Sequence, residues 1–160
     1  MTHGERIIAA LVALVSGIRT ANGYLTEAGA DTQDTPMFTP FGEDGADEWH
    51  TLVYESSEDL NGSAGAHGNG QTDVAVLPTY NIDVFWRGPN PGPAYQRVKH
   101  DLRKALQPGR IEDGTGALGA LTVYGPTLIT DQLSAGIVGL RQPVSVQHWE
   151  RVGDPDNITT

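Results

Sequence analysis

Histidines are the side chains in this chain best suited to metal binding and acid–base chemistry. There are five of them, His3, His50, His67, His100 and His148, and each lies in a different segment. A metal site on one helix needs two histidines about four residues apart, and no pair has that spacing. Cysteine is absent from the sequence, which excludes thiolate ligands and disulfides. The sequence therefore predicts no metal site and no cofactor.

Hydrolytic catalysis needs a nucleophile, an oriented base and an oxyanion site close together. No serine lies in a Gly-x-Ser-x-Gly motif, and Ser145 falls in the middle of a predicted strand. Asp83 and Asp101 are carboxylates on a predicted strand and a predicted helix, without such a nucleophile to serve. The segment D-P-D-N at 154–157 lacks the glycine and the later glutamate of a calcium loop. The residues predict no catalytic site, and a small enzyme or ligand-binding domain is a minor alternative.

Length and charge limit the remaining classes of protein. The chain has 160 residues, enough for one domain, which we expect to span 1–152. Its net charge of −10 disfavours general binding to nucleic acid, because phosphate contacts need clustered Lys and Arg. The longest apolar run, residues 7–15, is far shorter than the roughly 20 residues that span a bilayer. We therefore expect no membrane association and assembly in a cytoplasm.

The charges are unevenly distributed along the chain. No Lys or Arg lies between Arg19 and Arg87, whereas ten acids fall between Glu27 and Asp59. Half of the basic residues lie in one short segment, 97–110. One interpretation is a solvated helix face with acidic loops. The other is an interface in which an acidic arm of one subunit meets a basic helix of its neighbour. The candidate interface residues are Tyr24, Glu43, Asp44, Asp47, Glu48, Arg97, Arg103 and Lys104.

The first half of the chain reads as one helix, an arm and two strands. Thr2-His3-Gly4-Glu5 fits a capping box, and apolar residues at helical spacing predict a helix over 3–18. Gly17 or the Asn22-Gly23 pair can end this helix. The segment 27–48 is predicted to be an extended acidic arm. Strands are expected at 50–56 and 73–86, joined by a flexible glycine-rich loop, 61–71, which lacks the lysine of a phosphate-binding loop.

The second half reads as one helix followed by two strands. A helix is predicted over 94–106, with a basic outer face. Strands follow at 120–125, with a continuation at 127–131, and at 137–152. The tail 153–160 is expected to be loose. The fold class predicted from this order is α+β. It consists of a mixed or antiparallel sheet of about four strands with two helices packed on one face, plus an extended arm and long loops.

Several motifs are shared with one known family. They are R-I-I-A-A-L-x-A-L-V-x-G-I at 6–18, T-A-N-G-Y-x-T-x-A-G at 20–29, P-T-Y-N-I-D-V at 78–84 and D-L-R-K-A-L at 101–106. Together with a closing strand that ends before Asp154-Pro155, they follow one order of elements across nearly the whole chain. In these features the chain resembles the tail terminator family of long-tailed bacteriophages, the relatives of minor tail protein U.

The resemblance implies a structural virion protein without enzymatic activity. Such a protein forms a sixfold ring that binds the last ring of the tail tube, stops its growth and presents a surface for head joining. Its partners are other copies of itself, the tail-tube protein and the neck or head-completion proteins, while DNA passes through without specific binding. In this interpretation Asn22-Gly23 turns the chain out of the first helix and Tyr24 anchors the arm. A neck or head–tail joining ring, or a tail-tube subunit, is the alternative.

Overall fold

The computed structural model describes residues 1–34, 41, 48–61, 66–67, 71–88, 91–151 and 154–159. In these ranges it has two α-helices, α1 (His3–Ser16) and α2 (Pro91–Ala105), and two short 3-10 helices, η1 (Thr20–Asn22) and η2 (Leu133–Ala135). Its nine strands are β1 (Thr32–Gln33), β2 (Glu48–Asn61), β3 (Ala66–His67), β4 (Gln71–Arg87), β5 (Gly109–Asp113), β6 (Gly116–Val123), β7 (Thr127–Ile129), β8 (Ile137–Arg151) and β9 (Asp154–Thr159).

Both helices begin close to where the sequence predicts. The capping box of α1 is confirmed, because Thr2 Oγ1 accepts from Glu5 N at 3.3 Å and Thr2 N donates to Glu5 Oε2 at 2.6 Å. Gly17 caps the C-terminal end of α1, two residues before the predicted boundary. The helix α2 begins at Pro91, a few residues earlier than expected.

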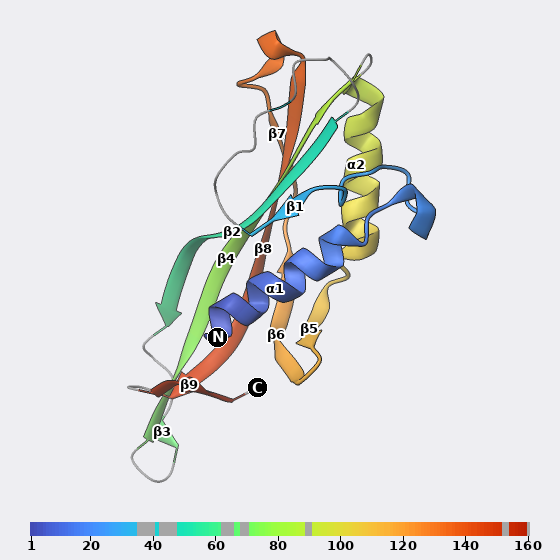
Figure 1. The fold of residues 1–160 in the computed structure, drawn as a ribbon. Coiled ribbons are helices and arrows are strands. Elements are labelled where there is room, and N and C mark those ends of the chain that lie inside the picture. The colour runs from blue at the N-terminus through green and yellow to red at the C-terminus, as the bar shows by residue number, and fades with distance from the viewer. Residues whose placement is uncertain are drawn as a thin grey trace.

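The strands form a long, twisted sheet, shown in Figure 1. Its main order is β1-β2-β4-β8-β6-β5, with β3 on β4 and both β7 and β9 on β8. The strand β8 pairs with β4 along one edge and with β7, β6 and β9 in turn along the other. Only β1 and β2 are parallel among the described pairs. The prediction of a sheet of about four strands is therefore wrong.

The strands that the sequence did not predict are short and mostly polar. Strand β1 has two polar residues, and β5 contributes a single buried side chain, Ile111. Strand β7 lies within the predicted continuation 127–131, but it is a separate short strand paired with β8. Hydrophobic alternation cannot detect such strands, because backbone pairing with a longer neighbour holds them in place. Strands β5 and β6 form a hairpin that turns at Gly114 and Thr115.

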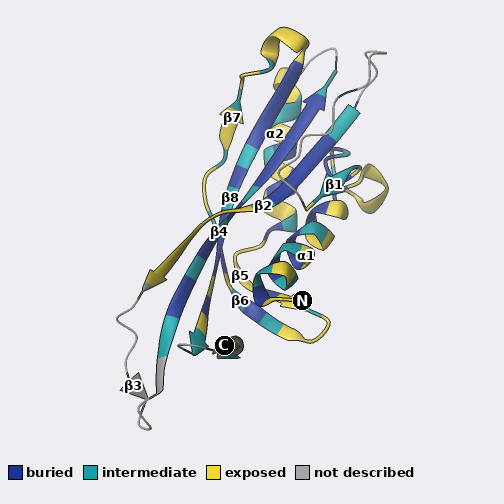
Figure 2. Ribbon diagram, turned by 60° about the vertical axis from the view of Figure 1, so that its left-hand side comes forward, coloured by how far each residue is buried: buried dark blue, intermediate teal, exposed yellow. Residues whose placement is uncertain are grey.

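One apolar core lies between the helices and a single face of the sheet. Alternate residues of β4 face this core, where Tyr80, Ile82, Val84 and Trp86 are all at most 2% exposed. They pack in one cluster with side chains of the two helices and of β8, namely Ile7, Leu11, Val15, Val98, Leu102, Leu140 and Val144. Figure 2 shows this buried band along the centre of the sheet. Trp49 stacks on Trp86, with ring centroids 5.7 Å apart.

Three predicted segments have a different or only partly described outcome. The tail 153–160, expected to be loose, contains β9, whose Ile158 is paired with Glu150 of β8. Of the predicted arm 27–48, residues 35–40 and 42–47 lie outside the described part of the chain, and Thr32–Gln33 pairs with β2. Most of the glycine-rich loop 61–71 is also outside it, although Ala66–His67 forms β3.

Candidate functional site

The motif at residues 20–29 forms a compact turn after α1. A short 3-10 helix, Thr20–Asn22, is followed by Gly23 at a φ of 82°, a left-handed conformation that glycine adopts without a steric penalty. The side-chain amide of Asn22 donates to the carbonyl oxygen of Gly17 at 3.0 Å. This bond supplies a partner for a backbone oxygen at the end of α1. Asn22-Gly23 therefore turns the chain, as predicted from the sequence.

Glu27 closes this turn on itself. Its carboxylate accepts from the Thr20 hydroxyl, from Thr20 N at 2.9 Å and from Arg19 Nε at 2.6 Å. These bonds favour the charged form, so the two bonds from Thr20 and then the Arg19 bond lower the pKa of Glu27 to about 2. Glu27, one of the ten acids between Glu27 and Asp59, therefore stabilises this turn within the chain.

Asp101 connects α2 to the same turn. Its buried carboxylate accepts from Leu25 N at 3.0 and 3.1 Å and from Thr26 Oγ1 at 2.8 Å. A buried carboxylate is costly unless hydrogen bonds compensate its desolvation, and these bonds do so. His100 Nδ1 lies 3.3 Å from the same group. The only acid of α2 therefore points inward and holds the helix against residues 25–26.

Two of the predicted interface residues, Tyr24 and Lys104, contact each other within one chain. Lys104 Nζ lies 4.6 Å from the centroid of the Tyr24 ring, and it donates to the carbonyl oxygen of Gly23 at 2.8 Å. The Tyr24 ring is half-buried and packs against the apolar core. This geometry is a cation–π contact and makes both residues part of the turn. Tyr24 does anchor the start of the predicted arm.

Arg97 and Arg103 form the exposed basic face of α2, together with Lys104. Both arginines are exposed, and neither forms an ion pair with a described residue. Lys99 lies beside them and contacts the Tyr95 ring at 5.8 Å. Because Asp101 is buried, no acid of α2 offsets these charges. The predicted basic outer face is confirmed for these residues, and we call it the basic face of α2.

The predicted acidic half of the interface is only partly described. Glu48 lies on β2, where it accepts from Arg87 Nη2 at 3.2 Å and contacts His50 Nε2 at 2.9 Å. It is therefore engaged within the chain. The other acids predicted for this surface lie outside the described residues: Glu43, Asp44 and Asp47.

A second acidic surface, not singled out from the sequence, lies on the far half of β2. Glu55, Glu58 and Asp59 are exposed there, and none forms an ion pair with a described residue. Burial, and then the negative charge of Glu58, raise the pKa of Glu55. We call these three residues the acidic edge of β2. The sequence signal was present, because all three belong to the long stretch without Lys or Arg.

An ion-pair network that the sequence did not reveal crosses three strands on the face away from the helices. Arg141 binds buried Asp83 through Nε at 2.8 Å and Nη2 at 2.7 Å, and Tyr54 OH donates to the same carboxylate at 2.9 Å. These bonds to Asp83 raise the pKa of Arg141. The bidentate geometry fixes the register of β2, β4 and β8. Both oxygens of the Asp83 carboxylate accept hydrogen bonds within the chain, so we assign this network a structural role.

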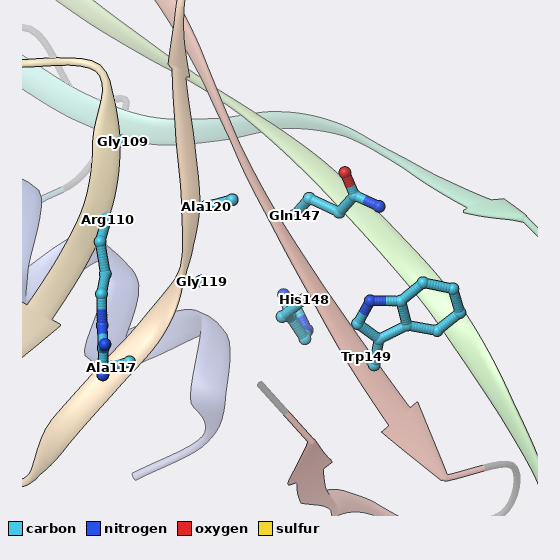
Figure 3. Close-up of a pocket in the computed structure, with 8 residues that line it drawn as sticks. All are labelled: Gly109, Arg110, Ala117, Gly119, Ala120, Gln147, His148 and Trp149. Carbon is cyan, nitrogen blue, oxygen red and sulfur yellow. The ribbon is translucent and has the colours of Figure 1, made fainter.

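An open hollow of about 450 Å³ lies where β6 diverges from β8, shown in Figure 3. It is lined by Gly109, Arg110, Ala117, Gly119, Ala120, Gln147, His148 and Trp149. This lining contains no carboxylate, serine or threonine. His148 Nε2 lies 2.8 Å from Glu150, and its ring lies 4.3 Å from that of buried His3. The described lining therefore offers no nucleophile with an oriented base.

Metal-binding and membrane-spanning features were also sought in the described ranges. There, no group of three His, Asp or Glu side chains is placed to hold a metal ion. No helix in those ranges is both long and apolar enough to cross a bilayer.

No protein-family model matches the chain, and no curated protein matches its sequence.

Proposed function

We propose that this protein is a structural component of a long-tailed phage, a tail terminator whose copies form a sixfold ring. The ring caps the last ring of the tail tube, stops its growth and presents a surface to the proteins that complete the neck and head. Its role is assembly rather than catalysis. Its net charge of −10 suits a ring through which DNA passes, because an acidic protein does not retain the phosphate backbone.

The observation that carries this proposal is the contact between two motifs of the resemblance. The motif at 20–29 and the motif at 101–106 are far apart in sequence, yet they bind each other directly. Asp101 accepts from Leu25 N and Thr26, and Lys104 donates to Gly23. This contact gives both motifs one physical role, which is to hold α2 against the end of α1. It supports the resemblance because unrelated chance matches would have no reason to meet.

The basic face of α2 supports a role in assembly. A closed ring of identical subunits needs two different, complementary surfaces on each copy. Arg97 and Arg103 are exposed on a helix that Asp101 and Lys104 fix in position. A charged surface held rigidly in this way can steer and orient a partner. The basic face is therefore one half of the proposed ring contact.

A tail-tube subunit is the second candidate, and one observation favours it. Strands dominate the described chain, and β2, β4 and β8 extend together beyond the helices (Figure 1). Such an extension suits contacts between stacked rings of a tube. The experiment below separates the two roles.

The test is electron microscopy of lysates from a phage in which this gene is disrupted. A terminator predicts overlong, irregular tubes without heads. Tails of normal length beside filled heads would place the protein in the neck, and absence of tubes would make it a tube subunit. Normal infectious particles would overturn the assembly role altogether.

A variant test addresses the basic face directly. Arg97→Glu with Arg103→Glu is expected to abolish assembly while leaving the monomer folded, because both side chains are exposed. Lys104 is kept, since its bond to Gly23 belongs to the fold. The control adds acid elsewhere, at exposed positions of η2: Ser134→Glu with Ala135→Glu. Equal assembly of the double variant and the wild type would exclude the basic face from the contact.

A further inference from the structure

The far half of β2 is an exposed strand at the edge of the sheet. Its inner side pairs with β4 as far as Asn61, whereas β1, the described strand on its outer side, pairs with Thr51 and Leu52. Every side chain from Glu55 to Leu60 is exposed, as Figure 2 shows. An exposed edge of this kind is a place where another chain can attach.

The charges on this edge are not compensated within the described chain. Glu55, Glu58 and Asp59 lie within five positions of one another and none forms an ion pair there, although the charge of His148 opposes the rise in the pKa of Glu55. Their mutual repulsion makes an external cation favourable, and a guanidinium is the best match because it binds carboxylates in a fixed, forked geometry.

A buried hydroxyl beside this edge also lacks a partner. Tyr80 is fully buried, and its hydroxyl has no hydrogen bond to a described residue. Glu55 and Glu58 lie near enough that their charges, after burial, help to raise the pKa of Tyr80. The negative charge of this edge is therefore felt as far as the buried Tyr80 hydroxyl.

The basic face of α2 has the complementary charge and lies elsewhere on the molecule. In both Figure 1 and Figure 2, the far half of β2 and α2 lie at opposite sides of the fold. One chain cannot bring them together, but two copies can. A contact between two different surfaces of identical subunits is head-to-tail, and it closes into a ring when the rotation allows.

We infer that the acidic edge of β2 binds the basic face of α2 on a second copy of this chain, with Glu55, Glu58 and Asp59 receiving Arg97 and Arg103. This inference deepens the proposed function and rests on it, since it names both surfaces of the ring contact. The sheet edge positions the carboxylates, and the turn at 20–29 positions the arginines.

The first experiment is complementation of the gene-disrupted phage with charge-swapped variants. Glu58→Arg with Asp59→Arg, or Arg97→Glu with Arg103→Glu, is expected to lower infectious particles by about a hundredfold or more, because like charges then face each other. Both swaps in one chain should restore particles to within about tenfold of wild type. Co-expression of the two defective variants should also restore assembly. When the two variants alternate around the ring, each edge meets a helix face of opposite charge.

The second experiment uses the natural absence of cysteine. Chains carrying Glu58→Cys are co-expressed with chains carrying Arg103→Cys during infection, and particles are treated with a short thiol crosslinker. We expect a crosslinked dimer from the mixture and much less from either variant alone. Pairing Glu58→Cys with Ser134→Cys, on η2, is the matched control.

The outcomes separate this contact from the proposed function. Full assembly by Glu58→Arg with Asp59→Arg, or failure of the combined swap to restore particles when the protein is soluble and folded, would overturn the contact. If the swap variant does not fold, Glu58→Gln with Asp59→Asn and the crosslink decide instead. A crosslink between the variant copies, together with tails of normal length in the gene-disrupted phage, would retain the contact. It would refute only the terminator role.

Discussion

At the residue scale, Gly29 is the position with the least space. A Cβ atom added there would lie 2.3 Å from Val15 O and 2.7 Å from Ser16 O, both backbone atoms at the end of α1. We expect Gly29→Ala to lower the free energy of unfolding by about 2 kcal/mol or more, because backbone cannot move aside cheaply. Chemical denaturation measures this change. Gly92→Ala, which meets nothing within 4 Å, should cost nothing, and equal stability of the two variants would refute the close packing.

Asp101 is the second residue whose removal should lower the free energy of unfolding. Asp101→Ala leaves Leu25 N and the Thr26 hydroxyl without their acceptor in a buried site. We expect a loss of about 3 kcal/mol in the free energy of unfolding, since hydrogen bonds to a charged group are among the stronger ones. Asp131→Ala, at an exposed position, is the control. A loss below about 1 kcal/mol would show that the turn holds without this carboxylate.

These residue roles were only partly accessible from the sequence. The turn at Asn22-Gly23 and the anchoring by Tyr24 follow from local chemistry, so they could be predicted. The partners Asp101 and Lys104 could not, because nothing local shows that a helix more than seventy residues later packs on this turn. The Asp83–Arg141 pair was hidden for the same reason, since strand register alone brings it together.

At the element scale, the N-terminus of α1 is attached to the sheet by a buried histidine. His3 Nε2 lies 2.8 Å from Leu118 O, and the ring contacts His148. Burial, and then the charge of His148, lower the pKa of His3 below its ordinary 6.5, with Arg6 acting the same way and Leu118 and Glu150 opposing. The folded state therefore prefers neutral His3.

The direction of this shift predicts acid sensitivity. Stability from neutral His3 is complete above about pH 6.5 and is lost as the pH falls below 6.5 towards the lowered pKa of the folded state. The free energy of unfolding should therefore decline from pH 7 to about pH 5 in the wild type, and less steeply in His3→Gln. Identical slopes in the two proteins would contradict the assignment.

The elements also differ in how well sequence reveals them. Both helices and the long strands β2, β4 and β8 have apolar periodicity of their own, so their positions were predicted to within a few residues, except that β2 continues well past its predicted end. Strands β1, β5, β7 and β9 are defined by a neighbour's backbone, and β9 contains two aspartates and a proline. The count of about four strands failed because pairing, rather than periodicity, creates the others.

At the scale of the whole molecule, opposite charges lie on opposite sides of one fold. Attraction between exposed charges is screened within about 10 Å at 0.1 M salt. We therefore expect crosslinking between Glu58→Cys and Arg103→Cys copies to fall several-fold as NaCl rises from about 0.05 M to about 0.5 M. A yield that is constant over this range would indicate an apolar contact instead of an electrostatic one.

The strand β8 has a consequence for how the chain is made. It pairs with β4, β6, β7 and β9, so four described strands depend on a segment that leaves the ribosome after most of the chain has emerged. Until then, the edge of β4 that pairs with β8 in the folded protein is unpaired in the nascent chain. Slower translation before residue 137 should prolong this unpaired state and favour capture by chaperones or aggregation, and faster release should improve the yield of folded protein.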